Sequence, residues 1–328
     1  MIHRTLGAHI ERWPVRGAFT ISRGAKREVE VVVARFDENG AVGRGEATAI
    51  YYHGESAASV LETIVSHRTD LEAGLDRMAL QEMLPRGAAR NALDCALWDL
   101  EAKRSGVPVW RLAGLPAPRP LETAFTISLG APERMEADAR AVATLPLLKL
   151  KLAGEGDIAR VAAVRRGAPG ARLIVDANEA WTGRDVAAEA TALLPFGVEL
   201  IEQPVKAGED HLLDGVNSPI PLCADESCQD RADLDRCIDR YAAINIKLDK
   251  AGGLTEALAL AAEARAAGLE LMVGCMLATS LGIAPAALVA QGARWVDLDG
   301  ALLLAEDRPQ AMMAEKGILS AAGPALWG

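Results

Sequence analysis

Charged side chains recur at regular intervals through the middle of the chain, each beside a short apolar run. In chain order they are Lys149, Lys151, Asp176, Glu202, Asp225 and Lys247, with the polar Asn178 two residues after Asp176. Successive charged positions from Lys151 onward are 22 to 26 residues apart. A spacing of this kind is typical of repeated strand–helix units, in which the end of each strand contributes one functional side chain.

The three acidic residues of this series predict an oxygen-only metal site. Carboxylates converging from neighbouring strand ends suit a hard dication such as Mg²⁺. The five histidines (His3, His9, His53, His67 and His211) stand apart from these strand ends, which argues against zinc or iron. Taken singly, each acidic residue has another interpretation, because an Asp or Glu just after a strand is often a helix N-cap.

The lysines on either side of the carboxylates predict proton transfer. Alternating lysines usually mark a solvated strand face, but Lys149 and Lys151 are flanked by leucines in a strand that we expect to be buried on both faces. Buried lysines need a partner or a function. A lysine on each side of a metal can take a proton from one face of a carbon and return it to the other. A dication stabilises the enediolate that forms when a proton α to a carboxylate is removed.

A parallel barrel is the element that would bring these side chains together. Eight short apolar strands are expected at 124–129, 147–152, 172–175, 198–201, 219–223, 243–246, 269–273 and 294–296, with helical stretches such as 156–166 and 254–267 between them. Roughly 22 residues per strand–helix unit matches a barrel. A doubly wound sheet is the alternative, but its glycine fingerprint is missing, since Gly43-x-Gly45 lies within an expected hairpin.

The first part of the chain has a different pattern. A β-branched run at 28–35 and a second run at 42–46 flank Asn39-Gly40, which predicts an antiparallel hairpin. Helical patterns follow at 56–66 and 88–103. We therefore expect an α+β domain over residues 1–118 and a barrel domain over residues 119–300.

Composition excludes several classes of partner. The formal net charge of −10 gives no general attraction for nucleic acid or anionic membranes, and the chain has no apolar run long enough to span a bilayer. The five cysteines form no C-x-x-C pair, and the first residues lack the apolar core of a secretory signal. We expect a cytoplasmic protein with free thiols.

The strand-end motifs resemble those of the enolase superfamily, muconate-lactonizing subgroup. They are Lys149-x-Lys151, Asp176-x-Asn178, Glu202-Gln203-Pro204, Asp225-Glu226-Ser227 and Asn245-Ile246-Lys247. The resemblance implies a modified (β/α)7β barrel and an α+β capping domain that the tail, residues 301–328, rejoins. It also implies that Asp176, Glu202 and Asp225 bind Mg²⁺, that Lys151 and Lys247 are the acid/base catalysts, and that Asn178 supports the metal site from behind.

Within this subgroup the chain resembles most the dipeptide epimerases, including those that act on L-Ala-D/L-Glu in murein peptide recycling. The discriminating feature is Asp297-x-Asp299, a pair that in this family receives the ammonium of a dipeptide. The resemblance implies a dipeptide substrate, pocket residues Thr126, Lys149, Cys275 and Leu277, and a possible homo-oligomer.

A cap loop at 22–27 is implied to select the side chain of the C-terminal residue, through Lys26 and Arg23. Relatives selective for Glu carry Arg where this chain has Lys26, and a lysine pairs with a carboxylate only as a point charge. For Arg23, an exposed basic turn is an equally good interpretation.

Two alternatives remain open. Muconate cycloisomerases and o-succinylbenzoate synthase-like members use the same site, although their substrates carry no ammonium for Asp297 and Asp299. A non-catalytic small-molecule binding protein on the same barrel is the other alternative.

Overall fold

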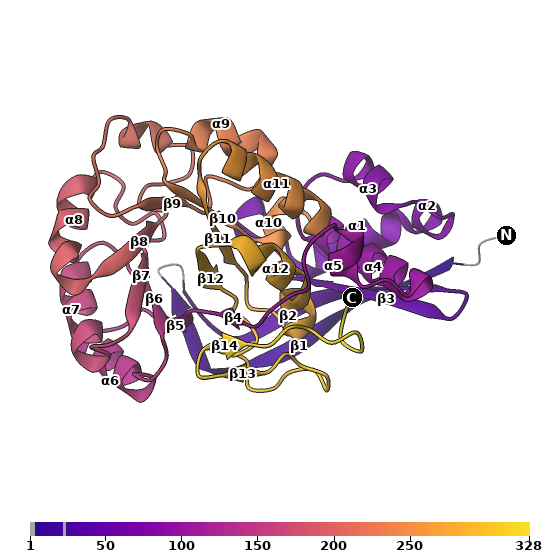
Figure 1. Cartoon of the computed structure of the whole chain (residues 1–328), viewed down its shortest axis with the longest axis horizontal. Coiled ribbons are helices and arrows are strands. Elements are labelled where there is room, and N and C mark those ends of the chain that lie inside the picture. Colours follow the sequence, from indigo (N-terminus) through magenta and orange to yellow (C-terminus); the bar gives the residue numbers. More distant parts are fainter. Residues whose placement is uncertain (1–3, 22–23) are drawn as a thin grey trace.

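The structure is a computed structural model, and it describes residues 4–21 and 24–328. Its centre is an eight-stranded parallel sheet in which the strands follow one another in chain order from β5 to β12. The backbone N–H of Ala124, just before β5, donates to the carbonyl of Val296 on β12 (2.8 Å), so the two edges of the sheet meet. Figure 1 shows the resulting barrel on one side of the molecule. The expected α/β barrel with an α+β cap is confirmed.

The barrel strands lie where the apolar runs predicted them. They are β5 (Phe125–Ile127), β6 (Leu147–Lys151), β7 (Arg172–Asp176), β8 (Val198–Glu202), β9 (Leu222–Ala224), β10 (Ala243–Ile246), β11 (Glu270–Gly274) and β12 (Trp295–Asp297). All five residues of β6 are buried, including both lysines. The interpretation of Lys149 and Lys151 as buried residues is thus confirmed.

Helices cover the outside of the barrel between most of the strands. They are α6 (Pro132–Ala141), α7 (Asp157–Gly167), α8 (Val186–Leu193), α9 (Leu234–Cys237), α11 (Leu254–Ala266) and α12 (Ser280–Val289). The one-turn helix α10 (Leu248–Ala251) is buried and contacts the cap helix α4. Between β8 and β9 the described chain has only the 3₁₀ turn η3 (Asp210–Leu213). Pro204, Gly208, Gly215 and Pro219 interrupt this connection, which leaves too short a stretch for an α-helix.

The cap is built on a three-stranded antiparallel sheet of β1 (Arg4–Ile21), β2 (Gly24–Glu38) and β3 (Ala41–Ala47). The β2–β3 hairpin confirms the expected one. Strand β1 was not predicted, because Pro14 and Gly17 interrupt it, and its pairing with β2 shifts register between Pro14 and Phe19. The cap helices are α1 (Ala57–Ser66), α2 (Arg68–Glu72), α3 (Arg77–Met83), α4 (Ala88–Ser105) and α5 (Val109–Leu112).

Helix α4 lies directly against β3, and two glycines make this close approach possible. A Cβ atom on Gly43 would lie 2.3 Å from the carbonyl oxygen of Ala96, and one on Gly45 would lie 2.1 Å from that of Ala92. The Gly-x-Gly pair that resembles half of a nucleotide fingerprint therefore serves helix–sheet packing.

The C-terminal tail touches both the barrel and the cap. Strand β13 (Ala314–Glu315) pairs with β14 (Ile318–Leu319), and β14 pairs with β4 (Leu121–Glu122), which precedes the barrel. Further along, Arg44 on β3 donates to the carbonyl of Leu326 (2.6 Å), and the Trp327 indole donates to the carbonyl of Cys95 on α4 (3.0 Å). Figure 1 shows the C-terminus beside the cap helices.

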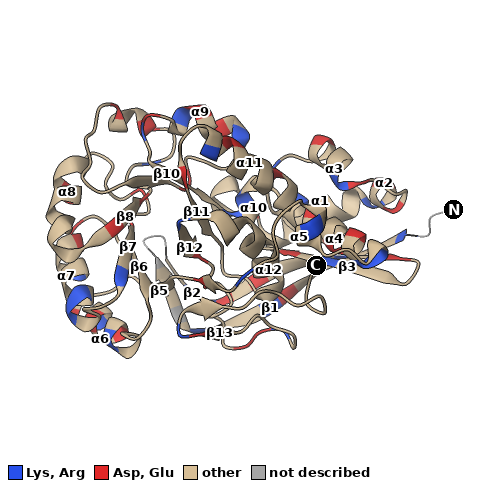
Figure 2. Cartoon of the chain, viewed as in Figure 1, with Lys and Arg blue, Asp and Glu red and all other residues tan. Residues whose placement is uncertain are grey.

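The outer surface carries charges of both signs. Figure 2 shows basic and acidic residues interspersed along outer helices such as α6 and α9. Among the described residues, no helix is both long enough and apolar enough to cross a bilayer. The five cysteines are free thiols, four of them buried.

Candidate active site

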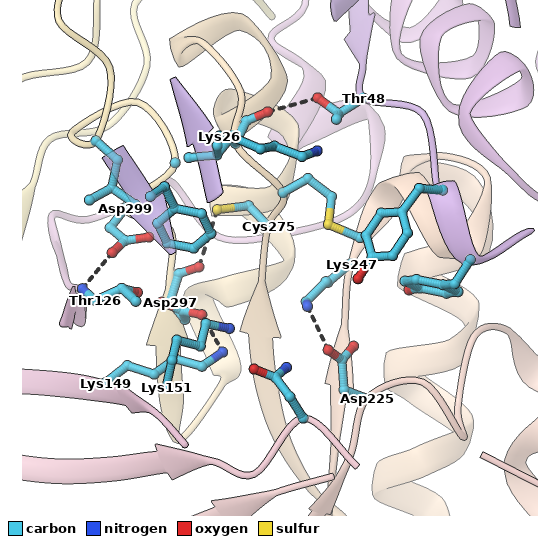
Figure 3. Close-up of a pocket in the computed structure, with 18 of the residues that line it drawn as sticks. Lys26, Thr48, Thr126, Lys149, Lys151, Asp225, Lys247, Cys275, Asp297 and Asp299 are labelled. Carbon is cyan, nitrogen blue, oxygen red and sulfur yellow. Dashed lines mark hydrogen bonds and ion pairs between the residues drawn. The ribbon is translucent and has the colours of Figure 1, made fainter. Parts of the chain in front are cut away.

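A cavity of about 270 Å³ lies between the cap and the carboxyl ends of the barrel strands. The cap contributes parts of the β1–β2 hairpin and the segment after β3, while the barrel contributes residues at or just after β5, β6, β7, β9, β10, β11 and β12. Figure 3 shows charged side chains entering this cavity from several strands.

Most of the site residues expected from the sequence line this one cavity. They are Lys26, Thr126, Lys149, Lys151, Asn178, Asp225, Lys247, Cys275, Leu277, Asp297 and Asp299. Asp176 and Glu202 do not line it, but both contact the lining residue Lys149. Arg23 lies outside the described residues.

The two candidate acid/base lysines reach the cavity from different sides. Lys151 ends β6, whereas Lys247 directly follows β10. Strands β7, β8 and β9 lie between β6 and β10 in the sheet. In a closed sheet of eight strands, β6 and β10 therefore lie on opposite sides of the barrel. Figure 3 shows Lys151 on the same side as Lys149, and Lys247 beside Asp225 on another wall.

On the first wall, Lys149 is a buried cation held by acidic residues. Its ammonium lies 2.5 Å from Glu202 Oε2, 2.7 Å from Asp297 Oδ2 and 3.5 Å from Asp176 Oδ2. Burial disfavours the charge, but these carboxylates outweigh burial and raise the pKa of Lys149 well above its usual value. Lys149 therefore stays protonated. The ammonium of Lys151 also lies 2.6 Å from Asp176 Oδ2.

On the second wall, Asp225 lies between two lysines. Its Oδ2 accepts a hydrogen bond from Lys247 (2.6 Å) and its Oδ1 one from Lys250 (2.5 Å). Burial opposes ionisation of Asp225, but the ammonium groups outweigh it and hold its pKa well below the usual value. The backbone N–H of Asp225 also donates to Gln203 Oε1 (2.8 Å), which fixes the loop that presents it.

The carboxylates of the middle strands lie next to each other because of strand register. Asp176 on β7 pairs with Glu202 on β8. Burial, together with the nearby Asp176 carboxylate, raises the pKa of Glu202 to about 7, although Lys149 works in the opposite direction. The amide of Asn245 donates to Glu202 Oε1 (2.7 Å). Two buried carboxylates side by side need a cation between them.

Asp176, Glu202 and Asp225 are the residues that could hold a metal. In the described part of the chain, no three acidic, histidine or cysteine side chains stand together as a ready metal cage, since lysine ammonium groups contact the carboxylates instead. The donor set is nevertheless oxygen-only and buried, as a hard dication requires. The Lys149 ammonium already occupies a position within 3.5 Å of both Asp176 and Glu202, as a bound cation would. The residues therefore fit such an ion.

A second acidic group lies at the end of β12. Asp299 Oδ2 accepts from the backbone N–H of Thr126 (2.7 Å), and burial together with Asp297 raises the pKa of Asp299 to about 7. Asp297 Oδ2 is taken by Lys149, but its buried Oδ1 has no hydrogen-bond partner among the described residues. Cys275 Sγ lies 3.3 Å from the carbonyl oxygen of Asp297, on the same wall.

The cap wall of the cavity carries Lys26. Its ammonium lies 5.7 Å from the centre of the Tyr51 ring. Lys26 is an exposed residue, yet partial desolvation of its ammonium lowers the pKa of Lys26 from its usual value. Its orientation over the cavity is visible in Figure 3.

Several residues of the site were not identified from the sequence. The cap contributes Thr48, Tyr51 and Tyr52. No motif marks them, because they reach the site only when the cap docks on the barrel. Glu226 and Lys250 carried a signal, since Glu226 lies within the motif that contains Asp225 and Lys250 comes three residues after Lys247.

Comparisons with known proteins agree with this geometry. Residues 4–114 match the family described as "Mandelate racemase / muconate lactonizing enzyme, N-terminal domain", and residues 134–317 match "Enolase C-terminal domain-like". The chain is 46% identical to the L-Ala-D/L-Glu epimerase of Escherichia coli K12 over 318 residues, which cover 96% of this chain and 99% of that protein. It is 47% identical to the N-acetyl-D-glutamate racemase of a Pseudoalteromonas species over 255 residues, 77% of this chain and 81% of that protein.

Among solved structures, a similar one is an enolase family member from Agrobacterium tumefaciens that is described as homologous to dipeptide epimerases. It has bound sodium and L-Ala-L-Glu. The two chains are 48% identical, with a TM-score of 0.96, and the match covers 99% of this chain and 100% of the other. The chain therefore belongs to the mandelate racemase/muconate lactonizing enzyme family, which has an enolase-like barrel domain.

Proposed function

We propose that the protein is a Mg²⁺-dependent dipeptide epimerase that interconverts L-Ala-L-Glu and L-Ala-D-Glu, as in murein peptide recycling. The names of the Escherichia coli relative and of the ligand in the Agrobacterium tumefaciens structure support this substrate. The five free thiols are consistent with work in a reducing compartment, and we place the reaction in the cytoplasm.

Lys151 and Lys247 would carry the proton transfer. Because they approach from opposite walls, one can remove the α-proton of the C-terminal residue from one face while the other delivers a proton to the opposite face. Lys149, held between Glu202 and Asp297, adds a fixed positive charge close to Lys151. It would pair with the substrate carboxylate as negative charge develops there.

Asp176, Glu202 and Asp225 would hold the Mg²⁺. Once bound, the ion supplies further positive charge for the carboxylate next to the reacting carbon, as in other enolase-superfamily sites. Asn178, whose backbone N–H donates to Asp176 Oδ1 (2.9 Å), would keep that ligand oriented.

The observation that carries the choice of a dipeptide is the unpartnered oxygen of Asp297. A buried carboxylate oxygen without a donor in the described structure costs free energy that a bound ammonium would recover. Asp299 would share this ammonium, while Thr126, Cys275 and Leu277 enclose the N-terminal residue. At the other end of the substrate, Lys26 would pair with the Glu side chain, but as a single point charge.

Racemisation of an N-acylated glutamate is the second candidate, favoured by the identity to the Pseudoalteromonas protein. Such a substrate has a neutral amide in place of the ammonium, so it would leave Asp297 Oδ1 unpaired. At about 1–3 kcal/mol for an unsatisfied buried group, we expect the dipeptide to be preferred by roughly 5- to 150-fold in kcat/KM.

Inversion rates for the two substrates decide between the candidates. The purified protein with Mg²⁺ is given L-Ala-L-Glu or N-acetyl-L-glutamate, and the two stereoisomers are separated by chiral chromatography. A higher kcat/KM for the dipeptide supports the proposal. A higher kcat/KM for N-acetyl-L-glutamate would establish the second candidate. If the protein inverts neither substrate, the epimerase proposal is wrong, and the cycloisomerase and o-succinylbenzoate synthase-like reactions would be tested next.

A further inference from the structure

The turn that begins at Lys247 receives hydrogen bonds from residues of the cap. Lys247 is the N-cap residue of the one-turn helix α10, so the position of this turn determines where its side chain starts. The next residues, Leu248, Asp249, Lys250 and Ala251, are all buried. Figure 1 shows α10 between the barrel and the cap helices.

The Asp249 side chain makes polar contacts between the start of this turn and the cap. Its Oδ1 accepts one hydrogen bond from the backbone N–H of Thr48, after β3, and another from the side-chain amide of Asn91 on α4, both at 2.9 Å. All three residues are buried. One carboxylate oxygen therefore ties two separate cap segments to the turn that follows Lys247.

A third cap residue binds the end of the same turn. Arg90 on α4 donates to the carbonyl oxygens of Ala251 (2.6 Å) and Gly252 (3.1 Å). Gly252 has a φ of +82°, and a Cβ atom there would lie 2.4 Å from Arg90 Nε. Helix α4 thus contacts α10 at two points: the side chain of Asp249, and the carbonyl groups at the end of the turn.

Thr48 extends this connection into the cavity. It lines the cavity itself, and its hydroxyl donates to the carbonyl of Leu277, another lining residue (2.7 Å). The Asp249 contact therefore sets the relative position of the cap wall and of Lys247.

Lys151 is positioned in a different way. It lies within the sheet, where its backbone pairs with Asp176 of β7 and its ammonium contacts the side chain of the same residue. These contacts belong to the barrel alone. Lys247 has a barrel contact of the same kind, with Asp225, but the turn that follows it is bound to the cap as well. Among these contacts, those from the cap therefore distinguish Lys247 from Lys151.

We propose that Asp249 is a positioning residue for Lys247, through which docking of the cap aligns one of the two acid/base lysines and leaves the other unaffected. This inference rests on the proposed two-lysine epimerisation. It predicts an asymmetric defect: loss of the Asp249 contact should impair proton removal from one diastereomer and spare the other.

The test measures exchange of the Glu α-proton for deuterium in D₂O, starting separately from L-Ala-L-Glu and L-Ala-D-Glu. The variants Lys247→Ala and Lys151→Ala first identify which diastereomer each lysine deprotonates. In Asp249→Ala, we expect exchange from the Lys247-dependent diastereomer to fall at least tenfold, and exchange from the Lys151-dependent diastereomer to stay within threefold of wild type. Asp249→Asn keeps an oxygen acceptor of the same shape and should restore most of the lost rate.

Asp94→Ala is the matched control. Asp94 is a buried carboxylate on the cap helix α4, one turn from Asn91, and it accepts hydrogen bonds from Thr255 at the start of α11 and makes none with α10 among the described contacts. This variant should show no asymmetry between the diastereomers. If Asp249→Ala does not fold, Asn91→Ala removes one donor from the same contact and should show a smaller defect of the same sense.

The outcomes separate this inference from the proposed function. If the wild-type protein exchanges neither diastereomer, the proposed epimerisation itself is wrong. If wild type exchanges both, the positioning role is overturned by an equal fall for both diastereomers, by unchanged rates, or by Asp249→Asn being as defective as Asp249→Ala.

Discussion

Replacing Lys149 by methionine tests whether this ammonium compensates the buried acidic residues of the site. Methionine is nearly as long and is apolar, so Lys149→Met removes the charge with little change in packing. The lost cation lies within 2.7 Å of two carboxylates and 3.5 Å of a third, and only 1% of its side chain is exposed. Removing one partner of a buried ion pair costs about 3–5 kcal/mol. We therefore expect the free energy of unfolding to fall by at least this amount.

Urea denaturation of the metal-free protein, followed by circular dichroism, measures the change. At roughly 2 °C per kcal/mol for a large domain, the melting temperature should also fall by about 6–10 °C. The matched control is Lys26→Met, the same substitution at a lysine that is solvent-exposed, which should change stability by about 0.5 kcal/mol or less. Unchanged or increased stability of Lys149→Met would refute the electrostatic account of the site.

Three further predictions concern Asp297, the contact between α4 and β3, and the buried Asp94. Asp297→Asn should raise KM for L-Ala-L-Glu about tenfold or more, because it weakens an ion pair with the substrate ammonium, and should affect N-acetyl-L-glutamate little; equal effects in steady-state kinetics would contradict this. Gly45→Ala should cost about 1–3 kcal/mol or more by pushing α4 off β3, whereas Gly7→Ala, where the nearest contact is 4.0 Å away, should be neutral in thermal melts. Burial raises the pKa of Asp94 to about 6, so its contribution to stability is full below pH 4 and is lost as pH rises through 6. Relative to Asp94→Asn, wild type should lose about 3 kcal/mol of unfolding free energy between pH 4 and 8, and parallel pH profiles would contradict the shift.

The sequence predicted the barrel and most of the cavity wall because both follow from local patterns. Apolar runs at a repeating interval placed β5 to β12, and parallel strands bring their carboxyl ends to one edge, so Lys151, Asp225 and Lys247 had to meet there. The reaction type came from the kinds of residue at that edge. The choice among members of the subgroup depended on the pair Asp297 and Asp299.

What the sequence did not predict depends on contacts between distant segments. Thr48 and Tyr52 enter the cavity only because the cap docks on the barrel. Strand β1 was not predicted because Pro14 and Gly17 interrupt its alternation of apolar and polar residues. The pairing of carboxylates with lysines was also not predictable in detail: Lys250, fully buried against Asp225, could be assigned this contact only once α10 was seen to fold back on the β9 loop.

The central claim is that Lys151 and Lys247 exchange protons with opposite faces of one carbon. Its most direct test incubates each single variant, Lys151→Ala and Lys247→Ala, with Mg²⁺ and either L-Ala-L-Glu or L-Ala-D-Glu in D₂O, with the Glu α-proton followed by NMR. We predict that each variant fails to invert the α-carbon but still exchanges the proton of one diastereomer, and that this diastereomer differs between the two variants. Inversion at the wild-type rate by either variant, or exchange of the same diastereomer by both, would contradict the claim.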